Sequence, residues 1–165
     1  MKSIYSLIIV IPFLFLLGSC QPDVKAVTTK TEETASTMVY DSVLASNLGA
    51  DEYGMKHYVL AFLRKGPNRD QDSIKTAQVM RKHLDNIKRM ADEGKLAIAG
   101  PFEDDGEIRG IYIFNVATIE EAKALTETDP AIQEGRLAME LHPWYGSAAL
   151  MTVPETHKKI AKSKI

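Results

Sequence analysis

The stretch "KHYVLAFLRKG", residues 56–66, decides the fold of this chain. Its β-branched and aromatic residues, closed by Gly66-Pro67, predict a β-strand. Both alternating faces of the strand are apolar, with Tyr58, Leu60 and Phe62 on one face and Val59, Ala61 and Leu63 on the other. A strand with one face in water would alternate with polar residues. We therefore expect this strand to be covered on both faces.

Downstream of this strand, the sequence alternates between helix and strand patterns. A helix is predicted at about 73–93, with Asp70 or Asp72 as its N-cap and Gly94 as its end. The next segments, "KLAIAGPF" (95–102) and "EIRGIYIFNV" (107–116), are predicted strands joined by the turn "EDDG". Thr118 and Glu121 form a capping box for a second helix, "IEEAKALTET". A helical turn, "PAIQEG", and a fourth strand, "RLAMELHPW" (136–144), complete the pattern.

The resulting order, β-α-β-β-α-β, is the ferredoxin-like pattern of α+β proteins. It predicts a four-stranded antiparallel sheet with its helices on one face only. The doubly apolar strand 56–66 requires a cover for the other face as well. We expect a homodimer in which two sheets meet face to face.

The first 20 residues predict an export signal and a lipid anchor. The apolar run at 4–17 is shorter than the span of about 20 residues that a membrane helix needs. Leu17-Gly18-Ser19-Cys20 resembles the lipobox of bacterial lipoproteins, so we expect cleavage after residue 19 and lipidation of Cys20. Gln21 in place of an aspartate favours the outer membrane of a bacterial envelope. The alternative is an ordinary secretory signal with a chance cysteine.

The remaining segments are assigned by composition. Residues 20–39 are poor in large apolar side chains and predict a flexible tether. Residues 40–54 predict an extension with a short helix, docked on a domain at 55–151. Residues 152–165 predict a loose basic tail. After loss of residues 1–19, 19 basic side chains face 22 acidic ones, a net charge of −3 that argues against a nucleic-acid surface.

A histidine lies in the helix at 73–93. At about 100° per residue, Met80, Leu84, Ile87 and Ala91 share one predicted buried stripe, and His83 lies about 60° to the side of Met80, at the rim. The structural interpretation is a border histidine that binds water. In the functional interpretation, a carboxylate orients the ring and makes it a general base. Asp129 could supply that carboxylate, although its place before Pro130 also suits a helix cap.

Other candidates are less specific. Gly100 and Pro101 end a predicted strand, and they either mark a plain strand exit or give a ligand close access to the backbone. Arg64 and Arg109 lie in strands, where either could hold an anionic group. A metal site of His57, Glu140 and His142 is conceivable but lacks a spacing pattern, so no metal is predicted.

Three segments together resemble the YciI-like (YCII-related) family: "RKHLDNIKRMADEGKLAIAGPF", "GIYIFNVATIEEAKAL" and "TDPAIQEGRLAMELHPW". The resemblance implies a ferredoxin-like fold, a dimer of the α+β-barrel class, and a histidine–aspartate pair in a pocket near the dimer interface. That pair corresponds to His83 and Asp129. The family's glycine and proline at the end of the second strand correspond to Gly100 and Pro101. The longer turn "RKGPNRDQDS" and the segment 40–54 depart from small cytoplasmic members of the family.

The sequence and the resemblance together predict a lipid-anchored protein that binds a small polar or aromatic molecule. One member of the family is a dehydrochlorinase, which suits lyase- or isomerase-type proton abstraction by His83 with Asp129 as its orienting partner. No cofactor is implied. The alternatives are a non-catalytic ligand-binding or assembly protein of the cell envelope and, with less support, a dimeric-barrel oxygenase.

Overall fold

The computed structural model of the chain describes residues 39–163. The predicted signal peptide, the predicted lipidation site Cys20 and all but the last residue of the predicted tether lie outside that range. Among the described helices, none has the length and apolar character needed to cross a membrane.

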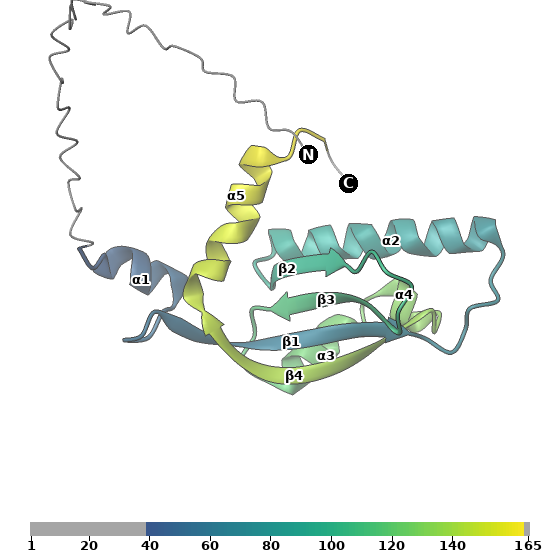
Figure 1. Cartoon of the computed structure of the whole chain (residues 1–165), viewed down its shortest axis with the longest axis horizontal. Coiled ribbons are helices and arrows are strands. Elements are labelled where there is room, and N and C mark those ends of the chain that lie inside the picture. The colour runs from purple at the N-terminus through teal and green to yellow at the C-terminus, as the bar shows by residue number, and fades with distance from the viewer. Residues whose placement is uncertain (1–38, 164–165) are drawn as a thin grey trace, which may run out of the picture. The chain divides into compact units, whose positions relative to one another are not determined.

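One antiparallel sheet carries the fold (Figure 1). Its strands are β1 (Met55–Lys65), β2 (Leu96–Pro101), β3 (Ile108–Phe114) and β4 (Leu137–Ser147), in the spatial order β2-β3-β1-β4. This order confirms the predicted α+β fold class and its ferredoxin-like topology. The doubly apolar β1 is central, hydrogen-bonded to β3 on one side and β4 on the other. β4 runs past its predicted end because its last residues pair with the start of β1, where Met55 lies opposite Ser147.

Helices α2 (Ser73–Asp92) and α3 (Ile119–Thr126) are the crossovers of the two β-α-β halves, and the short α4 (Pro130–Gln133) precedes β4. Local signals set their ends as predicted. The Asp72 carboxylate accepts a hydrogen bond from Lys75 N at 2.8 Å, so Asp72 is the N-cap of α2. The Thr118–Glu121 capping box begins α3.

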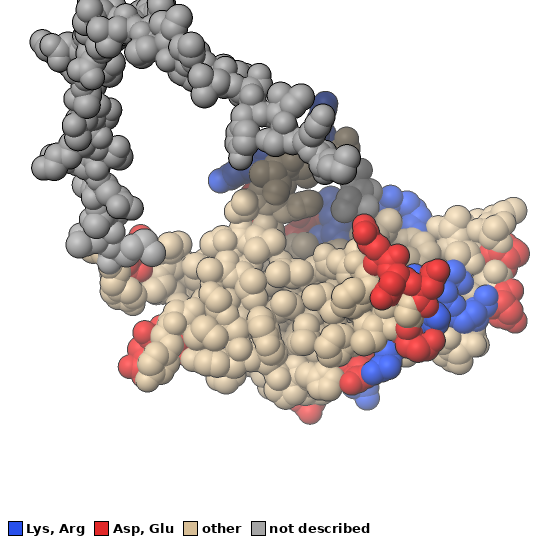
Figure 2. Space-filling model, viewed as in Figure 1, with Lys and Arg blue, Asp and Glu red and all other residues tan. Residues whose placement is uncertain are grey.

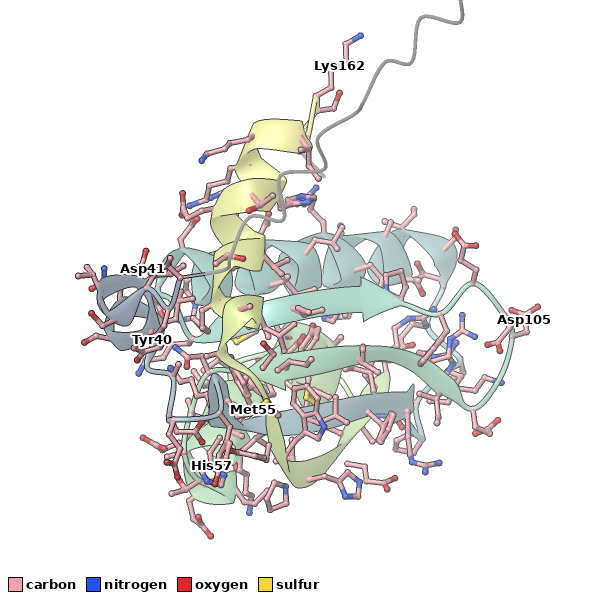
Figure 3. The ribbon with its side chains drawn as sticks, turned by 60° about the vertical axis from the view of Figure 1, so that its left-hand side comes forward. Tyr40, Asp41, Met55, His57, Asp105 and Lys162 are labelled. Carbon is pink, nitrogen blue, oxygen red and sulfur yellow. The ribbon has the colours of Figure 1, made fainter. Side chains whose placement is uncertain are left out.

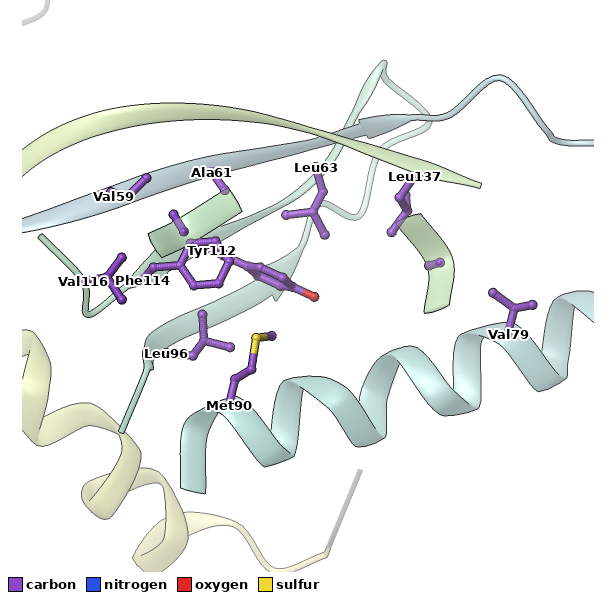
Figure 4. Close-up of a cluster of buried hydrophobic side chains, with 12 residues drawn as sticks. Val59, Ala61, Leu63, Val79, Met90, Leu96, Tyr112, Phe114, Val116 and Leu137 are labelled. Carbon is purple, nitrogen blue, oxygen red and sulfur yellow. The ribbon is translucent and has the colours of Figure 1, made fainter. Parts of the chain in front are cut away.

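The main core fills the space between the sheet and its helices. Val59, Ala61 and Leu63 of β1 point into it, and Met90 of α2 meets them from the other side (Figure 4). The opposite side chains of β1 face outward. At one end of that outer face, Tyr58 is covered by the 3-10 helix η1 (Ala148–Thr152). We call the sheet face that carries Tyr58, Leu60 and Phe62 the outer face.

The outer face is uncharged over most of its area. Figure 2 shows a broad area without Lys, Arg, Asp or Glu, and charged side chains gather at the end of the domain where β2 turns into β3. Asp105 marks the tip of that turn, and Tyr40 and Asp41 lie at the opposite end of the domain, beside α1 (Ser42–Leu48) (Figure 3). Gly49 ends α1 in the left-handed conformation, at φ 69°.

The predicted buried stripe of α2 is wrong by one position along the helix. The buried residues are Val79, His83, Asn86 and Met90, and the predicted stripe residues are only half-buried. Two polar side chains thus lie where we expected apolar ones. His83 tolerates burial because Asp129, far along the chain, supplies a hydrogen-bond partner, which the periodicity of one helix does not reveal. The Asn86 oxygen accepts hydrogen bonds from Thr128 and Arg89, whereas the buried Asn86 Nδ2 has no partner among the described residues.

The predicted loose tail is also wrong for most of its length. Residues Val153–Ile160 form α5, and Pro154, His157 and Ala161 line a hollow of about 570 Å³ with Leu84 and Ile87 of α2. Lys158 of α5 also lies 3.9 Å from the Asp92 carboxylate of α2. This segment is therefore a helix that faces α2 across the hollow, although none of its residues is buried.

Candidate functional site

His83 lies on the sheet-facing side of α2. Its side chain is almost fully enclosed, with the residue 5% exposed, and its ring stacks at 20° on the ring of Tyr112 from β3. The histidine is therefore not at the helix rim, where its position in the sequence placed it. It is held between α2, the sheet and the segment that leads into α4.

The predicted contact between His83 and Asp129 is present. His83 Nδ1 lies 2.8 Å from Asp129 Oδ2 and 3.0 Å from Oδ1. Asp129 is fully buried and is also the N-cap of α4, where Oδ1 accepts a hydrogen bond from Ala131 N at 2.8 Å. One carboxylate thus serves both as cap and as partner of the imidazole. Because a carboxylate only accepts, it favours the tautomer in which His83 Nδ1 carries the proton.

The residue before Asp129 is also fixed to α2. The Thr128 hydroxyl lies 3.2 Å from Asn86 Oδ1, and Arg89 reaches both Asn86 Oδ1 and the Thr128 hydroxyl, at 2.9 and 3.0 Å. Since His83, Asn86 and Arg89 are spaced three residues apart, they project from adjacent turns of the helix. These contacts hold Asp129 in position against His83.

Tyr112 faces the second nitrogen of the imidazole. Its hydroxyl lies 3.4 Å from His83 Nε2, a long contact in which the phenol is the donor when Nδ1 is protonated. Figure 4 shows that hydroxyl extending from β3 toward α2. Burial, and then the negative charge of Asp129, raise the pKa of Tyr112 far above its usual range, so it stays a neutral proton donor. Tyr112 was not among the predicted site residues, although strand alternation places it on the same face as the core residue Phe114.

A pocket of about 480 Å³ opens beside the imidazole. Among the predicted site residues, His83, Gly100, Pro101 and Arg109 line it. Asp129 lies behind His83, outside the lining. A Cβ on Gly100 would meet no atom within 4 Å, and Gly100 pairs with Ile111 rather than with the pocket residue Tyr112. Gly100 therefore contributes backbone to the pocket, and its neighbour Ala99 is the β2 residue whose side chain faces it.

Arg64 is the predicted site residue that the structure places elsewhere. It does not line the pocket, and it forms an ion pair with Glu140 of β4. Glu140 also contacts His142 Nε2 at 2.9 Å. Within residues 39–163, no three His, Cys, Asp or Glu side chains are grouped as a metal site would need, so the alternative of a His57–Glu140–His142 centre is not supported.

Two lining residues, Arg69 and Arg136, were also missed from the sequence. Arg69 lies on the long turn after β1, and Arg136 lies just before β4. Arg69 falls in the turn after the first predicted strand, and Arg136 is the first residue of the predicted fourth strand, 136–144. The unusual length of the turn "RKGPNRDQDS" is a sequence signal for Arg69 alone.

Comparison with known proteins assigns the domain. The model of the YCII-related domain matches residues 58–144. No match was found among curated proteins. A solved structure that matches is 5-chloro-2-hydroxyhydroquinone dehydrochlorinase from Burkholderia phenoliruptrix AC1100, in complex with 2,5-dihydroxybenzoquinone. It is 18% identical, with a TM-score of 0.41, and the match covers 52% of this chain and 92% of that chain.

Proposed function

Since this chain belongs to the YCII-related domain family, we propose that it binds a small polar or aromatic molecule in the pocket beside His83 and acts on it by general acid–base catalysis. The observation that carries the proposal is the buried contact of His83 Nδ1 with Asp129 Oδ2 at 2.8 Å, in a histidine that also lines the pocket. With Nδ1 protonated, the lone pair of Nε2 is the basic site.

The chemistry that this arrangement supports is proton abstraction of the lyase or isomerase type. Nε2 takes a proton from a carbon of the substrate, and Asp129 stabilises the imidazolium that forms. The electron pair left on the carbon expels a leaving group in a lyase, or shifts and is reprotonated at another carbon in an isomerase. When a substrate enters, the Tyr112 hydroxyl gives up its long contact with Nε2, which frees the Nε2 lone pair. The neutral phenol then donates its hydrogen bond to a substrate oxygen that gains negative charge.

Ligand screening by thermal shift tests the site. Small polar and aromatic compounds that raise the Tm of the unchanged full-length chain should raise that of His83→Ala much less. The exposed His57 provides a matched control, and His57→Ala should respond like the unchanged chain. Equal shifts for the unchanged chain and His83→Ala would contradict a role for His83 in the site.

Catalysis is tested separately from binding. Each compound that binds is incubated with protein in D₂O and followed by NMR for deuterium uptake or product. Turnover by the unchanged chain and none by His83→Ala supports the base. Binding without any change in the compound would leave the alternative, a non-catalytic ligand-binding or assembly protein.

We propose further that the protein is a homodimer. We also propose that it is anchored to the outer membrane of a bacterial envelope. The anchor is a lipid on Cys20, which lies outside the described residues. Two acyl signals would hold a protein stably on a bilayer, at about 0.8 kcal/mol per buried methylene. Mass spectrometry of the membrane fraction checks this, and a soluble protein with an unmodified Cys20 would contradict it.

A further inference from the structure

Three arginines border the pocket that His83 lines. They come from separate parts of the chain: Arg69 from the turn after β1, Arg109 from β3, and Arg136 from the segment between α4 and β4. Arg109 is largely engaged within its own turn, where it donates to the carbonyl oxygens of Asp104 and Gly106 at 2.7 and 3.4 Å. Arg69 and Arg136 therefore carry most of the positive charge that a ligand would meet.

The turn that carries Arg69 is hydrogen-bonded to the segment that carries Arg136. Gly66 N donates to Arg136 O and Asn68 N to Gly135 O, each at 2.9 Å. The Asn68 side chain also donates to Glu134 O at 3.1 Å. These bonds bring the two segments together, although nearly seventy residues separate Arg69 from Arg136 along the chain.

Glycine makes this close approach possible. A Cβ on Gly66 would lie 2.2 Å from Gly135 O, and a Cβ on Gly135 would lie 2.6 Å from Asn68 Nδ2. Gly135 also has φ at +65°, a conformation that other residues rarely adopt. The backbone itself is thus shaped to place the two arginines next to each other.

Arg69 and Arg136 line the same pocket without a neutralising carboxylate among the described residues. Arg69 donates to the backbone oxygen of Arg136 at 3.2 Å, and Arg136 donates to Gln71 Oε1 at 3.1 Å. In the part of the chain described, neither forms an ion pair with an acidic side chain. Burial, and then the charge of Arg69, lower the pKa of Arg136. A bound anion would relieve the repulsion that this placement creates.

The rest of the pocket suits an apolar body. Its lining is mainly aliphatic or aromatic: Leu63, Met80, Leu84, Ile87, Tyr112 and Leu137. Guanidinium groups bind planar carboxylates through paired hydrogen bonds. We propose that the ligand is a small carboxylate with an apolar or aromatic body, whose carboxylate is held by Arg69 and Arg136 and whose body reaches His83. This deepens the proposed function by naming a substrate class, and the role of His83 rests on that function.

Direct titration of the full-length chain by calorimetry tests the proposal. The probes are benzoate, 4-hydroxybenzoate and phenylacetate, their neutral amides, and inorganic phosphate. We expect at least one carboxylate to bind, its amide to bind about tenfold or more weakly, and affinity to fall as salt is raised. Arg69→Gln and Arg136→Gln should each weaken carboxylate binding by about tenfold.

Two controls separate this inference from the catalytic proposal. Arg81→Gln makes the same substitution at an exposed arginine that pairs with Asp85 on α2, and it should bind the carboxylate normally. His83→Ala should keep carboxylate selectivity and the effect of Arg136→Gln, even if it loses turnover. Loss of turnover in His83→Ala would therefore leave the proposal of carboxylate binding by Arg69 and Arg136 unaffected.

Several results would overturn the inference. The inference is wrong if no carboxylate probe binds, or if the amides or phosphate bind as tightly as the carboxylates. It is also wrong if the Arg69→Gln and Arg136→Gln proteins bind the carboxylate as tightly as the unchanged chain. Circular dichroism of each variant identifies any that fails to fold, and Arg136→Lys then replaces Arg136→Gln. Lysine keeps the charge but lacks the paired N–H donors of a guanidinium group. If Arg136→Lys binds the carboxylate as tightly as the unchanged chain, that result also counts against the proposal.

Discussion

Asp129 links the stability of the domain to the proposed chemistry. The same carboxylate caps α4 through Ala131 N and holds His83 Nδ1, and it is completely buried. A buried acceptor that satisfies two donors is costly to remove, because both donors are left without a partner and without water. One carboxylate thus makes both the helix cap and the contact with His83.

Removal of the Asp129 carboxylate should therefore lower the free energy of unfolding more than removal of an exposed helix cap. We expect Asp129→Ala to lower the free energy of unfolding by about 3 kcal/mol. Asp72→Ala, which removes the exposed cap of α2, should lower it by about 1 kcal/mol. Urea denaturation of both variants measures the difference, and equal losses would show that burial adds nothing to the cap.

Tyr112 should give the domain a measurable alkaline sensitivity. Its pKa in the fold is raised, first by burial and then by Asp129, above its ordinary value of about 10. The folded chain thus keeps a proton that the unfolded chain loses above that value. The stabilisation is fully present below about pH 10 and is lost as the pH rises further.

Comparison with Tyr112→Phe isolates this contribution. Above pH 10, the free energy of unfolding of the unchanged chain should fall more steeply than that of the variant, by up to about 1.4 kcal/mol per pH unit. Urea denaturation at a series of pH values gives both slopes. Identical slopes would mean that Tyr112 is not protected by the fold.

At the scale of elements, the junction between the turn after β1 and the segment before β4 positions the arginines. Its backbone hydrogen bonds leave no room for a side chain at Gly66. The long turn is therefore an ordered part of the domain, fixed to the segment that continues from α4. Asp129 at the start of α4 and Arg136 after its end belong to one short piece of chain, which couples the two halves of the site.

A methyl group at Gly66 should disrupt this junction. We expect Gly66→Ala to lower the free energy of unfolding by about 2 kcal/mol or more, because its Cβ would lie 2.2 Å from a backbone oxygen. Gly100→Ala adds the same methyl group where no atom lies within 4 Å, so it should change stability by less than about 0.5 kcal/mol. Denaturation curves that shift equally for both variants would argue against the close approach.

At the scale of the whole molecule, the outer face of the sheet is the surface most suited to a second copy. η1 covers only one end of it, and Leu60, Phe62 and Trp144 remain half-buried. The uncharged area in Figure 2 fits an interface between identical sheets. We propose that this face forms the dimer that the doubly apolar β1 requires.

A charge placed on that face should separate the subunits. Light scattering of the full-length chain at micromolar concentration should give the mass of a dimer, and Phe62→Glu should give a monomer. Phe102→Glu places the same charge on an exposed phenylalanine after β2 and should leave the dimer intact. A monomeric unchanged chain would contradict the proposal.

Local signals in the sequence determined the elements and their order. Asp72, Gly49 and the Thr118–Glu121 box mark helix ends through bonds to neighbouring residues, which sequence spacing specifies. The β-α-β-β-α-β order likewise predicted the four-stranded antiparallel sheet. The resemblance to a family, rather than periodicity, paired His83 with Asp129.

Only the tertiary structure decided which side chains surround the pocket. It buried His83 and Asn86 in place of the apolar stripe, set Tyr112 against the imidazole, and brought Arg69 beside Arg136. It also set α5 across a hollow from α2. Each of these outcomes depends on partners supplied by distant segments. Burial of a polar group is costly without such a partner, and the pattern of a single element does not contain that information.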